Sequence, residues 1–144
     1  MRIRELCTRD VDVVGPADTV RAAAERMRQR EVGSLVVVDD LGLPSGVVTD
    51  RDIVLRCTAD GLDPNATKVE HVMTRGAETI HEDLSVEDAV DRMSRAALSR
   101  LVVVDAKGLL TGLLSVDDVL VHVTGEVARL GELASVRRCA PTSV

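Results

Sequence analysis

The chain has 144 residues and a formal net charge of −6, an acidic balance that argues against broad, non-specific nucleic-acid binding. Its residues are 45% apolar but include no Phe, Trp or Tyr, so aliphatic side chains must form the core and no base can stack on an aromatic ring. No apolar run reaches the about 18 residues of a membrane span and no signal-peptide stretch opens the chain, so we expect a soluble, cytoplasmic protein.

The first half of the chain alternates helix and strand patterns. Apolar residues recur at helical spacing over residues 20–27, and Thr19 is placed to cap the helix that they predict. The run LVVVD at residues 35–39 is rich in β-branched residues, which predicts a strand buried on both faces. A turn then leads to a second predicted strand, SGVVT at residues 45–49, and a helix is expected from Asp50.

The same pattern returns 66 residues further along the chain. Residues 2–57 map onto residues 68–123 without a gap, and about a third of the positions in the helix–strand–strand part are identical, which indicates a duplication. Residues 58–67, TADGLDPNAT, contain Gly and Pro that break a helix, and they are predicted to link the copies. Residues 124–144 are predicted to form a C-terminal helix as far as about residue 133, followed by a frayed tail.

Each copy therefore reads as a β-α-β-β-α unit. A unit of about 55 residues buries little surface by itself. Two units packed sheet against sheet about a pseudo-twofold axis share one core. The expected fold class is α/β (α+β), with two repeats arranged in this way.

A hydroxyl residue and an acidic residue stand three positions apart at the same place in both copies. Thr49 and Asp52 in the first copy, and Ser115 and Asp118 in the second, follow a predicted strand and open a predicted helix. The spacing is that of a capping box, in which the two side chains bond backbone N–H groups at the helix start. Helix capping alone explains the pattern.

The same pattern also suits a nucleotide, and the two roles are compatible. A helix N-terminus and a hydroxyl group favour a phosphate, and a carboxylate can accept both hydroxyls of a ribose. Adenine needs no aromatic ring where strand backbone bonds its edge and aliphatic side chains cover its faces, a role that suits Val13, Leu35, Val36 and their repeat mates, among which Thr79 corresponds to Val13. The phosphate requires a cation, for which Arg51 and Arg100 are the candidates.

Both copies carry the motif LVVVD-x-x-G-x-x-x-G-h-h-T/S-x-x-D-h in register, where h is apolar. This tandem resembles a pair of cystathionine-β-synthase (CBS) domains, a Bateman module, over about residues 2–123. The segment SRLVVVDAKGLLTGLLSVDDVL is similar to nucleotide-sensing repeats in the γ subunit of AMP-activated protein kinase. TDRDIV followed by GLDPNAT is similar to small stand-alone two-CBS proteins of the hypoxic-response type.

The resemblance implies that the hydroxyl and acidic residues contact ribose and phosphate, and that an Arg at a strand start contacts phosphate. The first copy departs from this pattern, because Ser34 stands where the second copy has Arg100, so its phosphate contact depends on Arg51. Sites in the family borrow groups from both copies, so the site to which Arg100 belongs is open at this point. The expected nucleotide-binding residues are Val13, Ser34, Thr49, Arg51, Asp52, Thr79, Arg100, Ser115 and Asp118.

These inferences favour a regulatory module that senses an adenine nucleotide or another adenosyl ligand in the cleft between the two copies. AMP, ADP, ATP, NAD and S-adenosylmethionine are candidate ligands, and none is expected as a tightly bound cofactor. The resemblance implies a homodimer, and the readout requires an unknown effector protein. The alternative is a structural or partner-binding protein whose nucleotide sites are non-functional.

Motifs of other functional classes are missing from the sequence. There is no P-loop, His-Glu-x-x-His or Ser-His-Asp pattern, so an enzyme is not expected. The cysteines form no Cys-x-x-Cys pair and the histidines lack ligand spacing, so no metal site is expected. Cys57 is expected to be buried, and a disulfide between Cys7 and Cys139 is left open.

Overall fold

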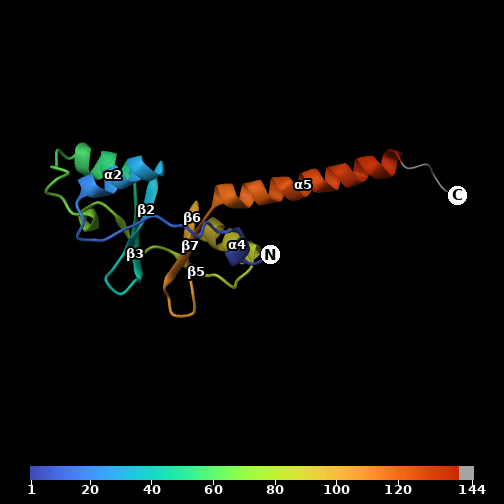
Figure 1. The fold of residues 1–144 in the computed structure, drawn as a ribbon, viewed down its shortest axis with the longest axis horizontal. Coiled ribbons are helices and arrows are strands. Elements are labelled where there is room, and N and C mark those ends of the chain that lie inside the picture. The colour runs from blue at the N-terminus through green and yellow to red at the C-terminus, as the bar shows by residue number, and fades with distance from the viewer. Residues whose placement is uncertain (140–144) are drawn as a thin grey trace.

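The structure is a computed structural model that describes the backbone of residues 1–139 and the side chains as far as residue 136. Figure 1 shows two small sheets with helices packed against them, and a long C-terminal helix that extends away from both. The chain is therefore of the mixed α/β class that the sequence predicts.

The first half contains the elements α1 (Ile3–Leu6), β1 (Val13–Val14), α2 (Val20–Arg30), β2 (Ser34–Val38), β3 (Pro44–Thr49) and α3 (Asp50–Ile53), which continues as a π-helical turn, Val54–Thr58. The second half contains a 3₁₀ turn (Val69–His71), β4 (Thr74–Arg75), β5 (Thr79–His81), α4 (Val86–Ala96), β6 (Arg100–Val104), β7 (Leu110–Ser115) and α5 (Val116–Cys139). The bounds of α4, β6 and β7 are those of α2, β2 and β3 shifted by 66 residues, so the sequence repeat is also a structural repeat.

Strand pairing follows the same repeat. The strand order is β1-β2-β3-β4 in one sheet and β5-β6-β7 in the other, with the first pair of each sheet parallel and the second pair antiparallel. Ser34 pairs with Thr49 at one end of the β2–β3 pair, and Arg100 pairs with Ser115 at the same end of the β6–β7 pair. The register therefore places the start of one strand beside the end of the next, where the candidate site residues lie.

Helix boundaries follow local signals. The Thr19 hydroxyl accepts a 3.1 Å hydrogen bond from the first turn of α2, and Ser85 forms a capping box with Asp88 at the start of α4, as their spacing predicts. Both helices end at a non-glycine residue with left-handed backbone, Glu31 with φ 55° and Ala97 with φ 54°. The left-handed residue turns the chain toward the following strand.

Each repeat has its own apolar core, but the segments that lead into the repeats are exchanged. Ile3 and Cys7, near the N-terminus, are buried in the core of the second repeat. Val69, Val72 and Met73, which precede the second repeat, are buried in the core of the first. The sequence pattern did not indicate this exchange, because an apolar lead segment looks the same whichever core receives it.

The exchanged segments also add strand pairing. β4 pairs with β3 of the first sheet, and Thr8 makes the equivalent bridge to Leu113 of β7. A Cβ on Gly46 would stand 2.5 Å from the Thr74 carbonyl oxygen, and a Cβ on Gly112 would stand 2.6 Å from Cys7 Sγ. Glycine at these two positions permits the crossing segments to lie directly against the strands.

The outer faces of β2 and β6 are buried between the repeats. Side chains alternate along a strand, so Val36 points away from the core that holds its neighbours Leu35 and Val37, yet it is fully buried. Val102 is its equivalent in β6 and is also buried. The predicted burial of this strand on both faces is thus confirmed, with the second face turned toward the other repeat.

The C-terminal helix is longer than the sequence suggested. α5 runs without a break from Val116 to Cys139, past the expected end near residue 133, and Figure 1 shows its second half projecting from the body. Val127, Leu130 and Leu133 are exposed on this projecting half. Within residues 1–139 no helix combines the length and apolar character needed to cross a membrane. The tail expected at residues 140–144 lies outside the described residues.

Candidate functional site

A cavity of about 220 Å³ lies where the two repeats meet. Strand β3 and the first turn of α3 form one wall, and the lead-in segment to β5 together with β6 and β7 forms the other. Its lining residues are Val47, Thr49, Asp52, Thr74, Gly76, Ala77, Glu78, Leu98, Ser99, Arg100, Val102 and Leu113. Because both repeats contribute to its walls, a molecule bound here contacts both.

Thr49 and Asp52 form the capping box that their spacing predicts. The Asp52 carboxylate accepts the Thr49 N–H through Oδ2 at 3.0 Å, and the Thr49 hydroxyl accepts the Asp52 N–H at 3.1 Å. The Asp52 side chain is only 14% exposed, so these bonds hold it in a defined position beside the cavity. Its Oδ1 takes no part in the cap, which leaves one carboxylate oxygen to accept a further hydrogen bond.

Two arginines provide positive charge near this carboxylate. Arg100, the first residue of β6, lines the cavity, so the structure joins it to Thr49 and Asp52 of the other repeat. The Arg56 Nη1 atom lies 3.6 Å from Asp52 Oδ1 and donates to the Val72 carbonyl oxygen at 2.9 Å. The Asp52 carboxylate therefore lies beside Arg56 of its own repeat and shares the cavity with Arg100 of the other repeat.

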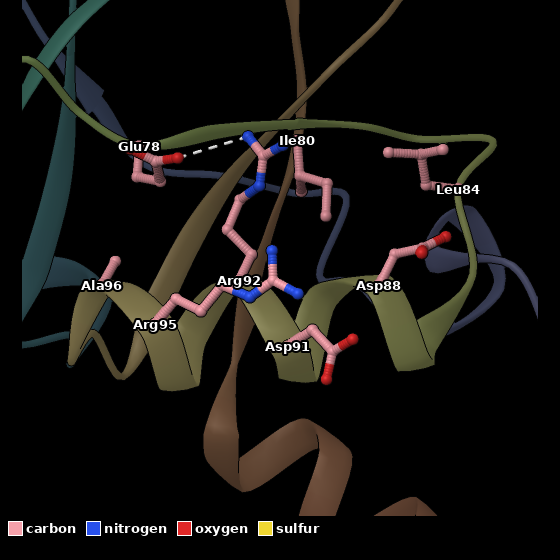
Figure 2. A pocket seen from close by; sticks show the side chains of 8 residues that line it. All are labelled: Glu78, Ile80, Leu84, Asp88, Asp91, Arg92, Arg95 and Ala96. Carbon is pink, nitrogen blue, oxygen red and sulfur yellow. Dashed lines mark hydrogen bonds and ion pairs between the residues drawn. The ribbon is translucent and has the colours of Figure 1, made fainter.

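Glu78 is the second acidic residue in the cavity wall, and Arg92 neutralises it. Figure 2 shows the two side chains pointing toward each other across the outer side of α4. The Arg92 Nη1 atom donates to Glu78 at 3.2 Å and to the Thr79 carbonyl oxygen at 3.0 Å. A hollow of about 440 Å³ lies on this outer surface, and Asp88, Asp91 and Arg95 also line the hollow. The ion pair thus offsets the negative charge that Glu78 would otherwise present to the cavity.

The second repeat contains the equivalent hydroxyl–carboxylate pair. Asp118 Oδ2 accepts hydrogen bonds from the Ser115 N–H at 2.8 Å and from the Ser115 hydroxyl at 2.7 Å. The Ser115 hydroxyl also accepts the Asp118 N–H at 3.1 Å, so this pair too caps its helix as predicted. Ser115 and Asp118 do not line the cavity that holds Thr49 and Asp52.

The remaining predicted residues lie around these two pairs. Ser34 is the ladder partner of Thr49, Val13 pairs with Val36, and Thr79 pairs with Val102. None of Ser34, Val13 and Thr79 is among the residues that line the cavity. Arg51 is exposed on α3 and also outside that lining.

Several lining residues were missed by sequence reasoning. Thr74, Glu78 and Ser99 come from the lead-in segment and the α4–β6 turn of the second repeat, and no motif marks them. Arg56 was also missed, although its position four residues after Asp52 on a predicted helix places the two side chains on one face. Only the packing of the repeats shows that the other residues reach the site.

Neither Cys7 nor Cys57 lines the cavity. Cys57 is 1% exposed and packs in the first core, as predicted. Cys7 is also buried, and burial raises the pKa of its thiol above the ordinary value. The Cys139 side chain, and with it the disulfide considered from sequence, lies outside the described residues. Within the described part of the chain, no three His, Cys, Asp or Glu side chains are grouped as metal ligands.

A family model of the CBS domain matches the chain twice, over residues 3–58 and 69–125. The chain therefore belongs to the CBS domain family and contains a CBS pair, or Bateman module. Among curated relatives, it is 32% identical over 118 residues to the uncharacterized protein MK0525 of Methanopyrus kandleri, covering 82% of this chain but only 60% of that protein. Hypoxic response protein 1 of Mycobacterium tuberculosis is 28% identical over 120 residues, 83% of each chain. The predicted likeness to hypoxic-response proteins is confirmed.

Solved structures share the fold. Hypoxic Response Protein I with two coordinated zinc ions aligns with a TM-score of 0.76 and 28% identity over 85% of this chain and 98% of that one. The CBS domain protein PAE2072 of Pyrobaculum aerophilum, complexed with AMP, aligns with a TM-score of 0.73 and 29% identity over 82% and 89%. The CBS pair of MJ0100, in complex with 5′-methylthioadenosine and S-adenosyl-L-methionine, aligns with a TM-score of 0.74 and 25% identity over 88% and 98%.

Proposed function

We propose that this CBS pair is a regulatory module that binds an adenosyl ligand in the cavity between its repeats. The observation that carries the proposal is that Thr49, Asp52 and Arg100 line one cavity although they come from both repeats. The AMP complex of PAE2072 and the adenosyl complexes of MJ0100 support the ligand class, because both proteins share the fold. AMP, ADP, ATP, NAD and S-adenosylmethionine are the ligands to be ranked.

Each polar group of the cavity has a role in this proposal. Asp52 Oδ1 accepts the ribose hydroxyls while Oδ2 remains in the helix cap. The Arg100 guanidinium donates to the phosphate, as a planar fork of N–H donors can. Val47, Val102 and Leu113 supply the apolar contacts for adenine, which the chain cannot stack on an aromatic ring.

Regulation follows from the position of the cavity between two cores. A ligand stabilises one arrangement of the repeats over another only if it binds that arrangement better, and contacts to both walls provide such a difference. The resulting change in packing is then read by an effector protein. We propose no catalytic step, and an adenosyl ligand is expected to be recovered unchanged after incubation with the protein.

A second copy of the chain is the other partner that we propose. Val90, Met93, Leu98, Val116 and Leu120 line an apolar groove of about 560 Å³ between α4 and α5. Leu120 is 53% exposed, and its repeat mate Val54 is 55% exposed, so both repeats present an apolar side chain at the same place. A homodimer about a twofold axis covers equivalent patches on both copies at once.

Calorimetric titration of the whole chain with adenine and guanine nucleotides tests the proposed function, because the chain has no aromatic residue to report binding by fluorescence. Saturable, adenine-selective binding that Asp52→Ala abolishes is the expected result. An absence of heat at two temperatures, together with no thermal stabilisation by any ligand, would contradict the proposal. The alternative, a partner-binding protein with non-functional nucleotide sites, would then account for the fold.

A further inference from the structure

We infer that the two hydroxyl–carboxylate positions of this chain select adenosyl ligands of opposite charge. The cavity at Thr49 and Asp52 takes a phosphate-bearing ligand. The equivalent position at Ser115 and Asp118 takes an adenosyl ligand without phosphate, neutral or cationic. The inference rests on the proposed function and adds the ligand class for each position.

The two positions share the groups that recognise ribose. The carboxylate of Asp52 accepts the Thr49 N–H at 3.0 Å, and that of Asp118 accepts the Ser115 N–H at 2.8 Å. Strand registers around the two positions are identical after a shift of 66 residues. A difference in ligand preference must therefore come from the residues around this common frame.

Three arginines in or beside the Asp52 position have no basic counterpart at the second position. Arg100 corresponds to Ser34, Arg56 corresponds to His122, and Arg51 corresponds to Asp117. Arg100 lines the first cavity, and Arg56 lies 3.6 Å from the carboxylate of Asp52. The second position has a hydroxyl, an imidazole and a carboxylate in place of three guanidinium groups.

The segments that lead into β1 and β5 also differ in charge. Gly76 and Glu78, at the first cavity, correspond in the repeat to Asp10 and Asp12, which line a hollow beside α2. Glu78 is balanced by its own arginine, Arg92 (Figure 2).

Asp10 and Asp12 share a single arginine. The distances from Arg30 are 2.8 Å to Asp10 and 2.7 Å to Asp12. One guanidinium group therefore offsets two carboxylates, and a net negative charge remains.

Arg9 is the basic residue that the crossing N-terminal segment brings to the second repeat. Its Nη1 atom lies 3.4 Å from Glu82, whose side chain is 16% exposed. This ion pair occupies Arg9, so it does not replace the cation that Arg100 supplies to the first cavity. A phosphate at the second position would meet Asp117 and Asp118 without the guanidinium group that Arg100 provides at the first, whereas a sulfonium or ammonium group would be attracted to these carboxylates.

Calorimetric titration of the full chain with AMP, adenosine and S-adenosylmethionine, which carries a net positive charge, tests the assignment. Asp52→Asn and Asp118→Asn are the matched variants, because an asparagine oxygen still accepts the capping N–H while the charge is lost. We expect one AMP per chain, lost in Asp52→Asn and kept in Asp118→Asn. We expect S-adenosylmethionine to show the reverse dependence and to bind in the presence of saturating AMP.

Exchanging Ser34 and Arg100, the first residues of β2 and β6, provides the decisive control. Ser34→Arg is expected to create a second AMP site, and Arg100→Ser is expected to weaken the first by about tenfold or more, as for the loss of a charge-assisted hydrogen bond. Two equal AMP sites in the unmodified chain, or loss of S-adenosylmethionine binding in Asp52→Asn alone, would overturn the charge assignment and leave the proposed function standing. No heat with any of the three ligands would overturn both.

Discussion

Arg100 and Asp52 line the same cavity although they belong to different repeats. Arg100 begins β6, and Asp52 lies in the first turn of α3. The sequence left open which site Arg100 serves, and the packing of the repeats brings it to the first one. A ligand that binds both residues contacts both repeats. In the proposed function, its phosphate binds Arg100 of the second repeat and its ribose binds Asp52 of the first.

Arg100→Gln is expected to separate phosphate recognition from ribose recognition. With the second position removed by Asp118→Asn, the affinity for AMP should fall by about tenfold or more, while the affinity for adenosine at the first cavity should stay within about twofold, because only the phosphate loses a charged donor. Calorimetric dissociation constants for the two ligands provide the measurement. Equal losses for AMP and adenosine would contradict the phosphate role of Arg100.

Arg92→Ala is expected to weaken AMP binding although Arg92 does not line the cavity. Removing it leaves Glu78 without its 3.2 Å ion-pair partner, so an unbalanced carboxylate faces the phosphate. Affinity for AMP should fall several-fold, with a larger effect at low salt than at high salt. Arg95→Ala is the control, because it removes the same charge from the same surface without freeing Glu78 (Figure 2). Identical effects of the two variants would exclude the proposed role of the ion pair.

Gly46→Ala and Gly112→Ala are expected to destabilise the fold. The added Cβ would stand 2.5 Å from the Thr74 carbonyl oxygen in the first case and 2.6 Å from Cys7 Sγ in the second. The neighbouring atoms must shift to avoid either overlap. This shift should lower the free energy of unfolding by about 1–3 kcal/mol, measured by urea denaturation. Gly125→Ala in α5 meets no neighbouring atom and should raise stability by up to about 1 kcal/mol. Unchanged stability in Gly46→Ala would contradict the close approach of β4 to β3.

Leu120→Glu is expected to dissociate the proposed homodimer. The substitution places a charge in the apolar groove between α4 and α5, where a second copy would have to bury it. Light scattering coupled to gel filtration should show a dimer for the unmodified chain and a monomer for this variant. Leu41→Glu is the control, since Leu41 is 77% exposed in the β2–β3 turn. A monomeric unmodified chain at high concentration would rule out the homodimer.

Alkaline conditions are expected to destabilise the chain through Cys7. Because burial raises the pKa of this thiol in the folded state, the unfolded chain loses the proton first as pH increases. The thiol's contribution to stability is therefore fully present below its unfolded pKa and is lost as pH rises toward its folded pKa. Urea denaturation at pH 7 and pH 10 should show a steeper loss of stability in the unmodified chain than in Cys7→Ala. Equal losses in the two proteins would show that another group is responsible.

The repeat, the strands and the capping pairs could be predicted from the amino-acid sequence. These features depend on short-range physics: the period of apolar residues, the burial preference of LVVVD, and hydrogen bonds between residues three positions apart. The pairs Thr49–Asp52 and Ser115–Asp118 formed as predicted, because each side chain reaches the backbone of its own first helical turn. Recognition of the CBS family followed from the same local features, repeated in register.

Which residues share a site depends on how the two repeats pack and could not be predicted from local sequence. Arg100, Glu78 and Ser99 reach the Thr49 cavity because the repeats pack against each other, and nothing in their local sequence specifies that contact. The exchange of Ile3 and Val69 between the two cores is also a long-range choice, since either core would bury the same apolar surface. Apolar burial is not directional, so a sequence can indicate that a segment is buried without indicating which core buries it. Gly46 and Gly112 then permit the close approach of the segment that packs there.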